Sequence, residues 1–132
     1  MEPGATDTIR KPEEHLRVIR FIGSGGYGKV FEVEHGVDKG HYAVKRIRVL
    51  ENGDSVAQRQ KDRDDILKEV KYLMLLRDES FVVFYYDAWF DWHTDDFIRD
   101  FDERWTGKKK KSYNPDGDVR RCYLYIRMEL CD

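Results

Sequence analysis

Cysteine, proline and long apolar runs are scarce in this sequence of 132 residues. The two cysteines, Cys122 and Cys131, lie neither in a C-x-x-C pair nor near a pair of histidines. A disulfide framework and a zinc site are therefore not predicted, and a reducing compartment fits best. No run approaches the roughly 20 apolar residues that span a bilayer, and the first residues lack the apolar segment of a signal peptide. We expect a cytoplasmic protein without membrane contact.

An excess of charge of one sign is also missing, because 24 Lys and Arg residues face 26 Asp and Glu residues. The whole chain therefore has no strong field toward nucleic acid or an anionic membrane. A run of four lysines, Lys108 to Lys111, could contact RNA or an acidic protein, or could belong to a solvated flexible insert. The tryptophans do not alternate with basic residues as in a base-stacking platform. We expect no direct nucleic-acid binding by this segment.

The N-terminal half of the chain has the pattern of consecutive hairpins. Residues 1–14 are polar and contain Pro3 and Pro12, and they predict a flexible arm. From His15 onward, a strand leads into a cluster of glycines, and "KVFEVEH" then places alternate residues on opposite faces of a second strand. Turn residues at positions 38–40 precede a third strand in "HYAVKRIRVL". The length of the chain fits one small domain or a piece of a larger protein.

The second half predicts one helix and two more strands. Ser55 and Gln58 have the spacing of a capping box, and apolar residues from Ile66 onward recur at helical spacing, so we expect a helix over residues 55–77. "FVVFYYDAWFD" and "CYLYIRMEL" are rich in β-branched and aromatic residues and predict strands four and five. Residues 92–121 between them are expected to be a mobile insert. The predicted fold is α+β, with a five-stranded antiparallel sheet packed on one long helix.

The stretch "FIGSGGYGKVFEVEHG" raises the question of what lies close to the four glycines within residues 23–28. A dinucleotide-binding turn would open a helix, whereas Val30 to Glu34 continue as a strand. A Walker phosphate loop would need Ser or Thr after Gly28-Lys29, and Val30 stands there. The pattern G-x-G-x-x-G-x-V of a glycine-rich hairpin over nucleotide phosphates is satisfied at every position. A tight hairpin with a bulge and no ligand remains the alternative.

A lysine lies where such a hairpin would need one. In "YAVKRI", Ala43 and Lys45 share one face of the third strand, so a small residue leaves room for adenine and an ammonium can reach the α- and β-phosphates. Glu69, on the helix face turned toward the sheet, is the expected partner that holds Lys45. Each of these two charges taken alone could instead be an ordinary solvated side chain.

Together, "IGSGGYGKVFEVEH", "YAVKRI", "EVKYLMLL", "YYDAWF" and "MELCD" resemble the N-terminal lobe of a protein kinase. They are most similar to the family that phosphorylates the α subunit of eukaryotic initiation factor two, and within it to the double-stranded-RNA-activated type. The resemblance covers His15 to Asp132, which we expect to be the lobe, ending at the hinge. It implies a serine/threonine kinase that controls translation under stress.

The resemblance also implies roles for individual residues. Lys45 and Glu69 would be the catalytic pair, Met128 the gatekeeper behind the adenine, and Glu129 to Cys131 the hinge whose backbone binds the base. The residues expected to bind ATP are Ile22, Gly23, Ser24, Gly25, Gly26, Tyr27, Gly28, Val30, Ala43, Lys45, Met128, Glu129 and Cys131.

The catalytic H-R-D, D-F-G and A-P-E motifs do not occur in the 132 residues, so the magnesium ligands and the catalytic base would lie in a C-terminal lobe. Two functions remain open. The segment is either part of an active kinase, with Mg-ATP, initiation factor two α as substrate and a homodimer formed through N-terminal lobes, or a non-catalytic module that regulates or inhibits a full kinase by pairing with it. Affinity for ATP by this segment alone is expected to be weak.

Overall fold

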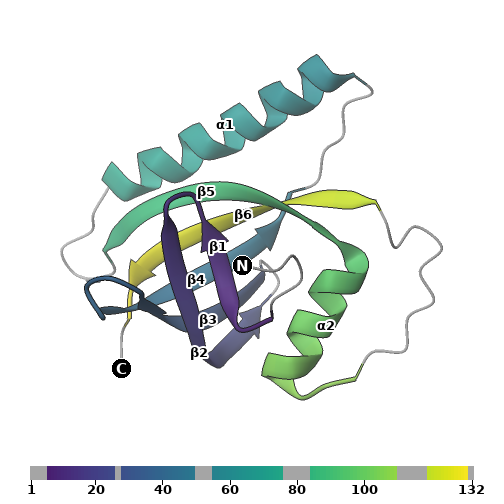
Figure 1. Cartoon of the computed structure of the whole chain (residues 1–132). Coiled ribbons are helices and arrows are strands. Elements are labelled where there is room, and N and C mark those ends of the chain that lie inside the picture. The colour runs from purple at the N-terminus through teal and green to yellow at the C-terminus, as the bar shows by residue number, and fades with distance from the viewer. Residues whose placement is uncertain (1–5, 26–27, 50–54, 76–83, 110–118, 131–132) are drawn as a thin grey trace.

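The computed structural model describes residues 6–25, 28–49, 55–75, 84–109 and 119–130. Antiparallel strands β1 (Thr8–Lys11), β2 (Glu14–Gly25), β3 (Gly28–His35) and β4 (His41–Arg48) come first along the chain, each paired with the next. Helix α1 (Val56–Leu75), strand β5 (Tyr85–Thr94), helix α2 (Asp95–Thr106) and strand β6 (Arg120–Glu129) follow. The α+β fold is consistent with a kinase N-terminal lobe (Figure 1).

The six strands form one sheet in the order β1-β2-β3-β4-β6-β5. β6 therefore lies between β4 and β5, and the sheet curls until its two edge strands approach each other. Arg10 on β1 donates two hydrogen bonds to Asp91 on β5, at 3.1 and 2.9 Å, and the Trp89 ring N–H donates to the Arg10 carbonyl at 3.0 Å. These side chains make the sheet a nearly closed barrel.

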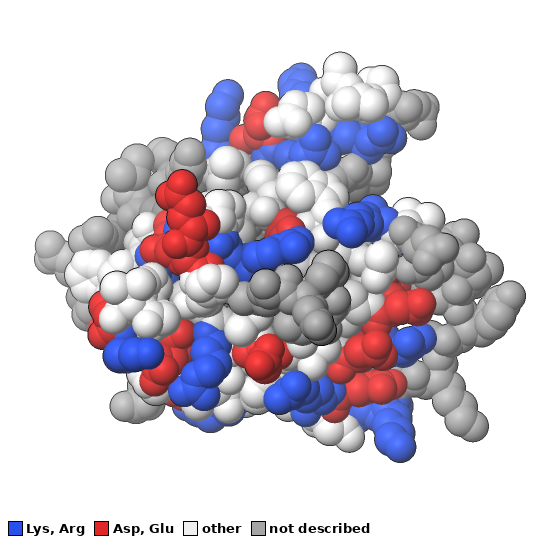
Figure 2. Space-filling model, viewed as in Figure 1, with Lys and Arg blue, Asp and Glu red and all other residues white. Residues whose placement is uncertain are grey.

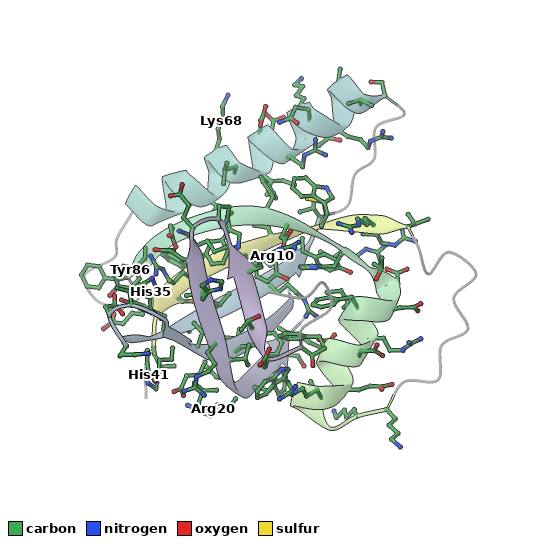
Figure 3. The ribbon with its side chains drawn as sticks, viewed as in Figure 1. Arg10, Arg20, His35, His41, Lys68 and Tyr86 are labelled. Atoms are coloured by element: carbon green, nitrogen blue, oxygen red, sulfur yellow. The ribbon has the colours of Figure 1, made fainter. Side chains whose placement is uncertain are left out.

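Apolar side chains are buried on both faces of the sheet. Phe31, Val33 and Val44 are fully buried on one face, where Phe101 of α2 packs against them. On the other face, Leu124 and Ile126 belong to a second cluster of buried side chains. Ile66, Leu67 and Val70 of α1 pack against this second cluster. Lys68 points away from the sheet (Figure 3), so α1 turns its apolar stripe inward as the sequence pattern predicts.

The start of α1 confirms the predicted cap, since Ser55 Oγ accepts a hydrogen bond from the Gln58 N–H at 3.1 Å. The predicted turn after β3 is also confirmed. Asp38 Oδ1 accepts from the Gly40 N–H at 2.7 Å, and the His35 N–H donates to the Gly40 carbonyl at 2.9 Å. Asx-type bonding of this kind is the usual role of aspartate in turns.

The expectation of five strands and one helix is wrong in two places. Residues 8–11, placed in the expected flexible arm, form β1. The turn between β1 and β2 uses Pro12 and Glu13, with Glu13 at a φ of 67°. Glycine or asparagine normally marks such a position, and its absence hid the hairpin from sequence reasoning. Lys11 and Glu14, directly opposite in the register, form an ion pair across it.

The second correction concerns the expected mobile insert at 92–121, whose first part is the end of β5 and the whole of α2. Thr94 caps the helix by accepting from the Phe97 N–H at 3.1 Å, and Gly107 ends it in the left-handed conformation at a φ of 73°. The side chains that pack against the sheet recur at helical spacing, and they are Phe97, Ile98, Phe101 and Trp105. The sequence therefore held a helical pattern that the charged residues between them obscured.

On the face drawn in Figure 2, positive and negative side chains of the described residues are interspersed. Lys108 and Lys109 are exposed, and the rest of the lysine run lies outside the described residues. Trp89 is 8% exposed in the core, as predicted. Cys122 is buried, and Cys131 lies outside the described residues.

Candidate nucleotide site

The glycine-rich segment is a hairpin between β2 and β3, which confirms the predicted strand, turn and strand. Its last three residue pairs are Gly23 with Val30, Ser24 with Lys29 and Gly25 with Gly28. Gly26 and Tyr27, at the tip, lie outside the described residues. The register shifts between Phe21 and Gly23, so a bulge is present as well. Hairpin and bulge alone therefore do not separate a phosphate-covering loop from a plain turn.

Two of the glycines have different surroundings. A Cβ atom at Gly28 would lie 2.1 Å from the carbonyl oxygen of Arg46, and Gly28 has a φ of +142°. Only glycine fits there, because the backbone of β4 passes too closely for any side chain. A Cβ atom at Gly23 would meet nothing within 4 Å. Gly28 is thus required by the fold, whereas Gly23 leaves open space beside the hairpin.

The register of β3, β4 and β6 brings predicted site residues onto one face. Val30 lies opposite Lys45, which lies opposite Ile126. Ala43 lies opposite Met128. Residues directly opposite in antiparallel strands share a face, so these residues line the face of the sheet that also carries α1. Ala43 is 5% exposed, and Val30, Lys45 and Met128 are half-buried.

Glu69 lies within α1, but its side chain is outside what the structure describes, so its pairing with Lys45 stays a prediction. The placement of the helix is compatible with it. Ile66 and Val70, which flank Glu69 along α1, pack on the cluster that contains Ile126, and Ile126 is the register partner of Lys45. Helix and lysine therefore share one face of the sheet.

The opposite end of this face is the expected hinge. The Glu129 N–H donates to the Phe84 carbonyl at 2.7 Å, and this bond extends the ladder between β5 and β6. Because that N–H is already paired with protein, a donor to an adenine would have to come from another hinge residue. Of the other two predicted hinge residues, Leu130 directly follows β6, and Cys131 lies outside the described part of the chain.

A charged cluster continues the same face beyond Ala43. His41 Nδ1 lies 2.7 Å from Glu32 Oε2 and its Nε2 lies 3.2 Å from Glu34 Oε2. Arg20 donates to Glu32 at 2.7 Å, and Figure 3 shows Arg20 and His41 near each other at this corner of the sheet. The hydrogen bond from His41 lowers the pKa of the Glu32 carboxyl, and the same bond raises the pKa of His41. Arg17 pairs with Glu34 as Arg20 pairs with Glu32, so two arginines balance the two carboxylates of the cluster.

Within the described ranges, no three or more His, Cys, Asp and Glu side chains are grouped so that they could hold a metal ion. The same part of the chain contains no helix that is both long and apolar enough to cross a bilayer.

No protein-family model matches the chain, but individual proteins do. It is 34% identical over 87 residues to eukaryotic translation initiation factor 2-alpha kinase 3 of Rattus norvegicus, covering 66% of this chain and 7% of that protein. It is 34% identical over 95 residues to eukaryotic translation initiation factor 2-alpha kinase pek-1 of Caenorhabditis elegans, covering 72% and 8%. It is 29% identical over 141 residues to eIF-2-alpha kinase GCN2 of Arabidopsis thaliana, covering 98% and 11%.

The chain is homologous to a segment of the eIF2-alpha kinases. This agrees with the predicted kinase resemblance at the level of the family. The chain spans only 7% to 11% of the length of these relatives, so their activity, substrate and partners are not carried over with the similarity.

The kinase-related segment contains two buried charged residues that sequence reasoning missed. Arg46, next to Lys45, points to the opposite face of β4 and donates to Asp102 Oδ2 of α2 at 2.8 Å. Their residues are only 7% and 8% exposed. The signal available in the sequence was Asp102 on the apolar stripe of α2, beside Phe101, where a lone carboxylate predicts a buried partner.

Proposed function

We propose that this chain binds the adenine and phosphates of ATP as the N-terminal lobe of a protein kinase of the eIF2-alpha kinase type. The observation that carries the proposal is the register of β3, β4 and β6, which aligns Val30, Ala43, Lys45 and Met128 on one face beside the glycine hairpin. Homology to kinase segments supports the same assignment.

The residues on this face of the sheet could contact both the adenine base and the phosphates of ATP. Ala43 presents a small side chain beside Val30 and Met128, so a flat base could lie against this face. Lys45 would hold the α- and β-phosphates through charge-assisted hydrogen bonds, and Glu69 would orient Lys45. The open space at Gly23 lets the hairpin backbone approach phosphate oxygens. ATP would supply the phosphoryl group, and magnesium would be held by residues outside the described ranges.

The finer parts of the proposal come from the family resemblance. The parent protein would be a serine/threonine kinase in the cytoplasm that phosphorylates the α subunit of initiation factor two. The sequence motifs favour the double-stranded-RNA-activated type. Its partners would be a C-terminal kinase lobe and a second copy, paired through the N-terminal lobes.

Nuclear magnetic resonance titration of the 132-residue chain with ATP tests the binding site. We expect saturable shifts in the amide signals of Gly23, Val30, Ala43 and Lys45, with a dissociation constant in the upper micromolar range or weaker, on a scale where 1 mM corresponds to about 4 kcal/mol. The described residues contribute a hairpin and one face of a sheet to the proposed site, and we expect low affinity from contacts on one side of the nucleotide.

Lys45→Met and Lys29→Met form a matched pair for this titration. Both remove one ammonium from the neighbouring strands β3 and β4, but Lys29 lies opposite Arg46 in the register, on the face away from the proposed site. Lys45→Met should weaken ATP binding at least tenfold, because a charge-assisted contact is worth about 1.5 to 3 kcal/mol, while Lys29→Met should not. Equal losses in both variants, or no saturable shifts in the unmodified chain, would refute the site.

A further inference from the structure

The side chain of Arg46 connects α2 to the strand that carries Lys45. Its guanidinium carbon lies 5.6 Å from the Phe31 ring centroid on β3, 5.8 Å from Phe101 on α2 and 5.6 Å from Tyr123 on β6. Asp102 of α2 accepts from Arg46 Nη2 at 2.8 Å. Three rings and a carboxylate thus fix the guanidinium, and cation–π contacts of a desolvated arginine are among the stronger ones.

The backbone of Arg46 meets the glycine hairpin. The Arg46 carbonyl oxygen lies 2.1 Å from the position that a Cβ atom at Gly28 would take. Arg46 directly follows Lys45, and the two pair with Lys29 and Val30 of β3. A shift of the Arg46 backbone would therefore reach Gly28 through the contact with the Arg46 carbonyl, and Lys45 through the peptide bond that joins the two residues.

The buried pair of Arg46 and Asp102 costs folding free energy that other contacts of α2 with the sheet do not. Within the described residues, Asp102 Oδ1 is buried and has no hydrogen-bond partner. An unpaired buried acceptor costs stability, and apolar residues often replace buried ion pairs without loss. α2 already has Phe97, Ile98, Phe101 and Trp105 to hold it on the sheet. A role in fixing geometry explains the pair better than a role in stability.

We propose that α2 is a positioning element of the nucleotide site, in which Asp102 acts through Arg46 to hold Gly28 and Lys45 in place. α1 and α2 pack on opposite faces of the curved sheet (Figure 1), so α2 contacts β3, β4 and β6 from behind the site. This inference rests on the proposed ATP site and adds a means of regulating it. A partner or modification that displaced α2 would weaken nucleotide binding without touching the nucleotide.

Asp102→Asn and Asp95→Asn test the positioning role as a matched pair on the same helix. Asp95 holds α2 to β6 through Arg121, with Arg121 Nε 3.0 and 3.1 Å from its two carboxylate oxygens. Each substitution removes one helix carboxylate charge from an arginine and keeps an oxygen acceptor. Asp102 is the one of the two whose described hydrogen bond goes to a β4 residue; the described bonds of Asp95 go to β6.

We expect Asp102→Asn to raise the dissociation constant for ATP roughly three- to tenfold, in the range found for residues that couple to a site without contacting the ligand. The amide signals of Gly28 and Lys45 should also shift without nucleotide, which a loss of helix stability alone would not produce. Asp95→Asn should leave both readouts unchanged. The same change in both variants, or unchanged signals and affinity in Asp102→Asn, would overturn the proposal.

Coupling between α2 and the site must work in both directions. Hydrogen exchange of the unmodified chain with and without saturating ADP therefore provides a second test, which does not depend on whether Asp102→Asn folds. The amides of α2 should exchange more slowly with ADP, and unchanged exchange at saturation would refute the coupling. If the unmodified chain binds no nucleotide, the proposed function fails, while the shifts of Gly28 and Lys45 in Asp102→Asn still decide whether α2 sets their geometry.

Discussion

At the scale of single residues, two glycines of one motif have separate reasons to be glycine. Gly28 has no room for a Cβ atom against the Arg46 carbonyl, whereas Gly23 has open space. A sequence pattern cannot make this distinction, because it counts both positions alike. The face alternation of Val30, Ala43 and Lys45 could be predicted, since it follows from the period of a strand. The close approach of β4 to Gly28 could not, because it depends on the register between strands.

Gly28→Ala should destabilise the chain by several kcal/mol, since a strained backbone conformation alone costs about 1–3 kcal/mol and the contact with Arg46 adds to that. Gly23→Ala should change the free energy of unfolding by less than about 1 kcal/mol. Urea unfolding followed by circular dichroism measures both. A well-folded Gly28→Ala variant with unchanged stability would contradict the close contact.

Two histidines should give the stability opposite dependences on pH. The His93 ring is stacked on Phe97, with centroids 4.7 Å apart, and its Nε2 lies 2.8 Å from the Tyr125 hydroxyl. Burial lowers the pKa of His93 from 6.5 to about 4, with nearby Asp91 opposing the shift. The folded state therefore disfavours the protonated ring.

Because the unfolded chain binds this proton more readily, stability should fall as the pH drops from about 6.5 to about 4, by on the order of 3 kcal/mol. His93→Gln should flatten that part of the profile.

His41, whose pKa is raised by its bond to Glu32, contributes stability that is fully present below its ordinary pKa and lost as the pH rises through the raised value. His41→Gln should therefore lower the stability most at pH values below the ordinary pKa of histidine and have little effect above the raised value. Denaturant midpoints across pH 4–8 measure both, and a pH-independent difference between His93→Gln and the unmodified chain would contradict the burial effect.

At the scale of elements, α2 is the part that sequence reasoning missed, and its caps and stripe explain why it forms. Thr94, the acidic first turn and Gly107 are ordinary helix signals. They lay within a segment of mixed charge between two strong strand patterns, and its length suggested a loop. The longer α1 was found because its cap and apolar spacing stood apart from any strand.

Phe101→Ala should cost about 3–5 kcal/mol, because the side chain is 3% exposed and packs edge-on to Phe31 at 5.3 Å between centroids. Arg99→Ala is the control on the same helix, since the described ion pairs of Arg99 join it to Asp96 and Asp100 of α2 itself. Surface changes of this kind are usually within about 0.5 kcal/mol. Thermal unfolding compares them. Equal melting temperatures for Phe101→Ala and Arg99→Ala would show that α2 is not part of the core.

At the scale of the whole molecule, side-chain contacts between the two edge strands of the sheet, β1 and β5, shield their unpaired edges from other chains. Among the strands that the structure describes, β1 pairs only with β2 and β5 only with β6. An unpaired strand edge is a template for association with other chains. Arg10, Asp91 and Trp89 join these edges. This closure could not be predicted from the sequence, because it depends on the curl of the sheet and on a strand that carried no turn signal.

A chain that lacks residues 1–11 should therefore associate, because it leaves the edge of β2 unpaired and removes the contacts of β1 with β5. It also exposes the core side chains that pack against the buried Ile9. Size-exclusion chromatography with light scattering should show a mass that rises with concentration. Arg10→Ala, which removes the ion pair but keeps β1, should stay monomeric over the same range. A monomeric truncated chain at high concentration would show that closure does not protect the edge.

The strand order has a consequence for biosynthesis. β6 comes last among the strands in the chain, yet it lies between β4 and β5 and pairs with both. Until residues 120–129 have left the ribosome, β4 therefore has one edge unpaired and β5 has no strand to pair with. Long-range pairing of this kind delays folding and leaves strands exposed meanwhile. The nascent chain should depend on chaperones most strongly in the interval between the emergence of β5 and that of β6.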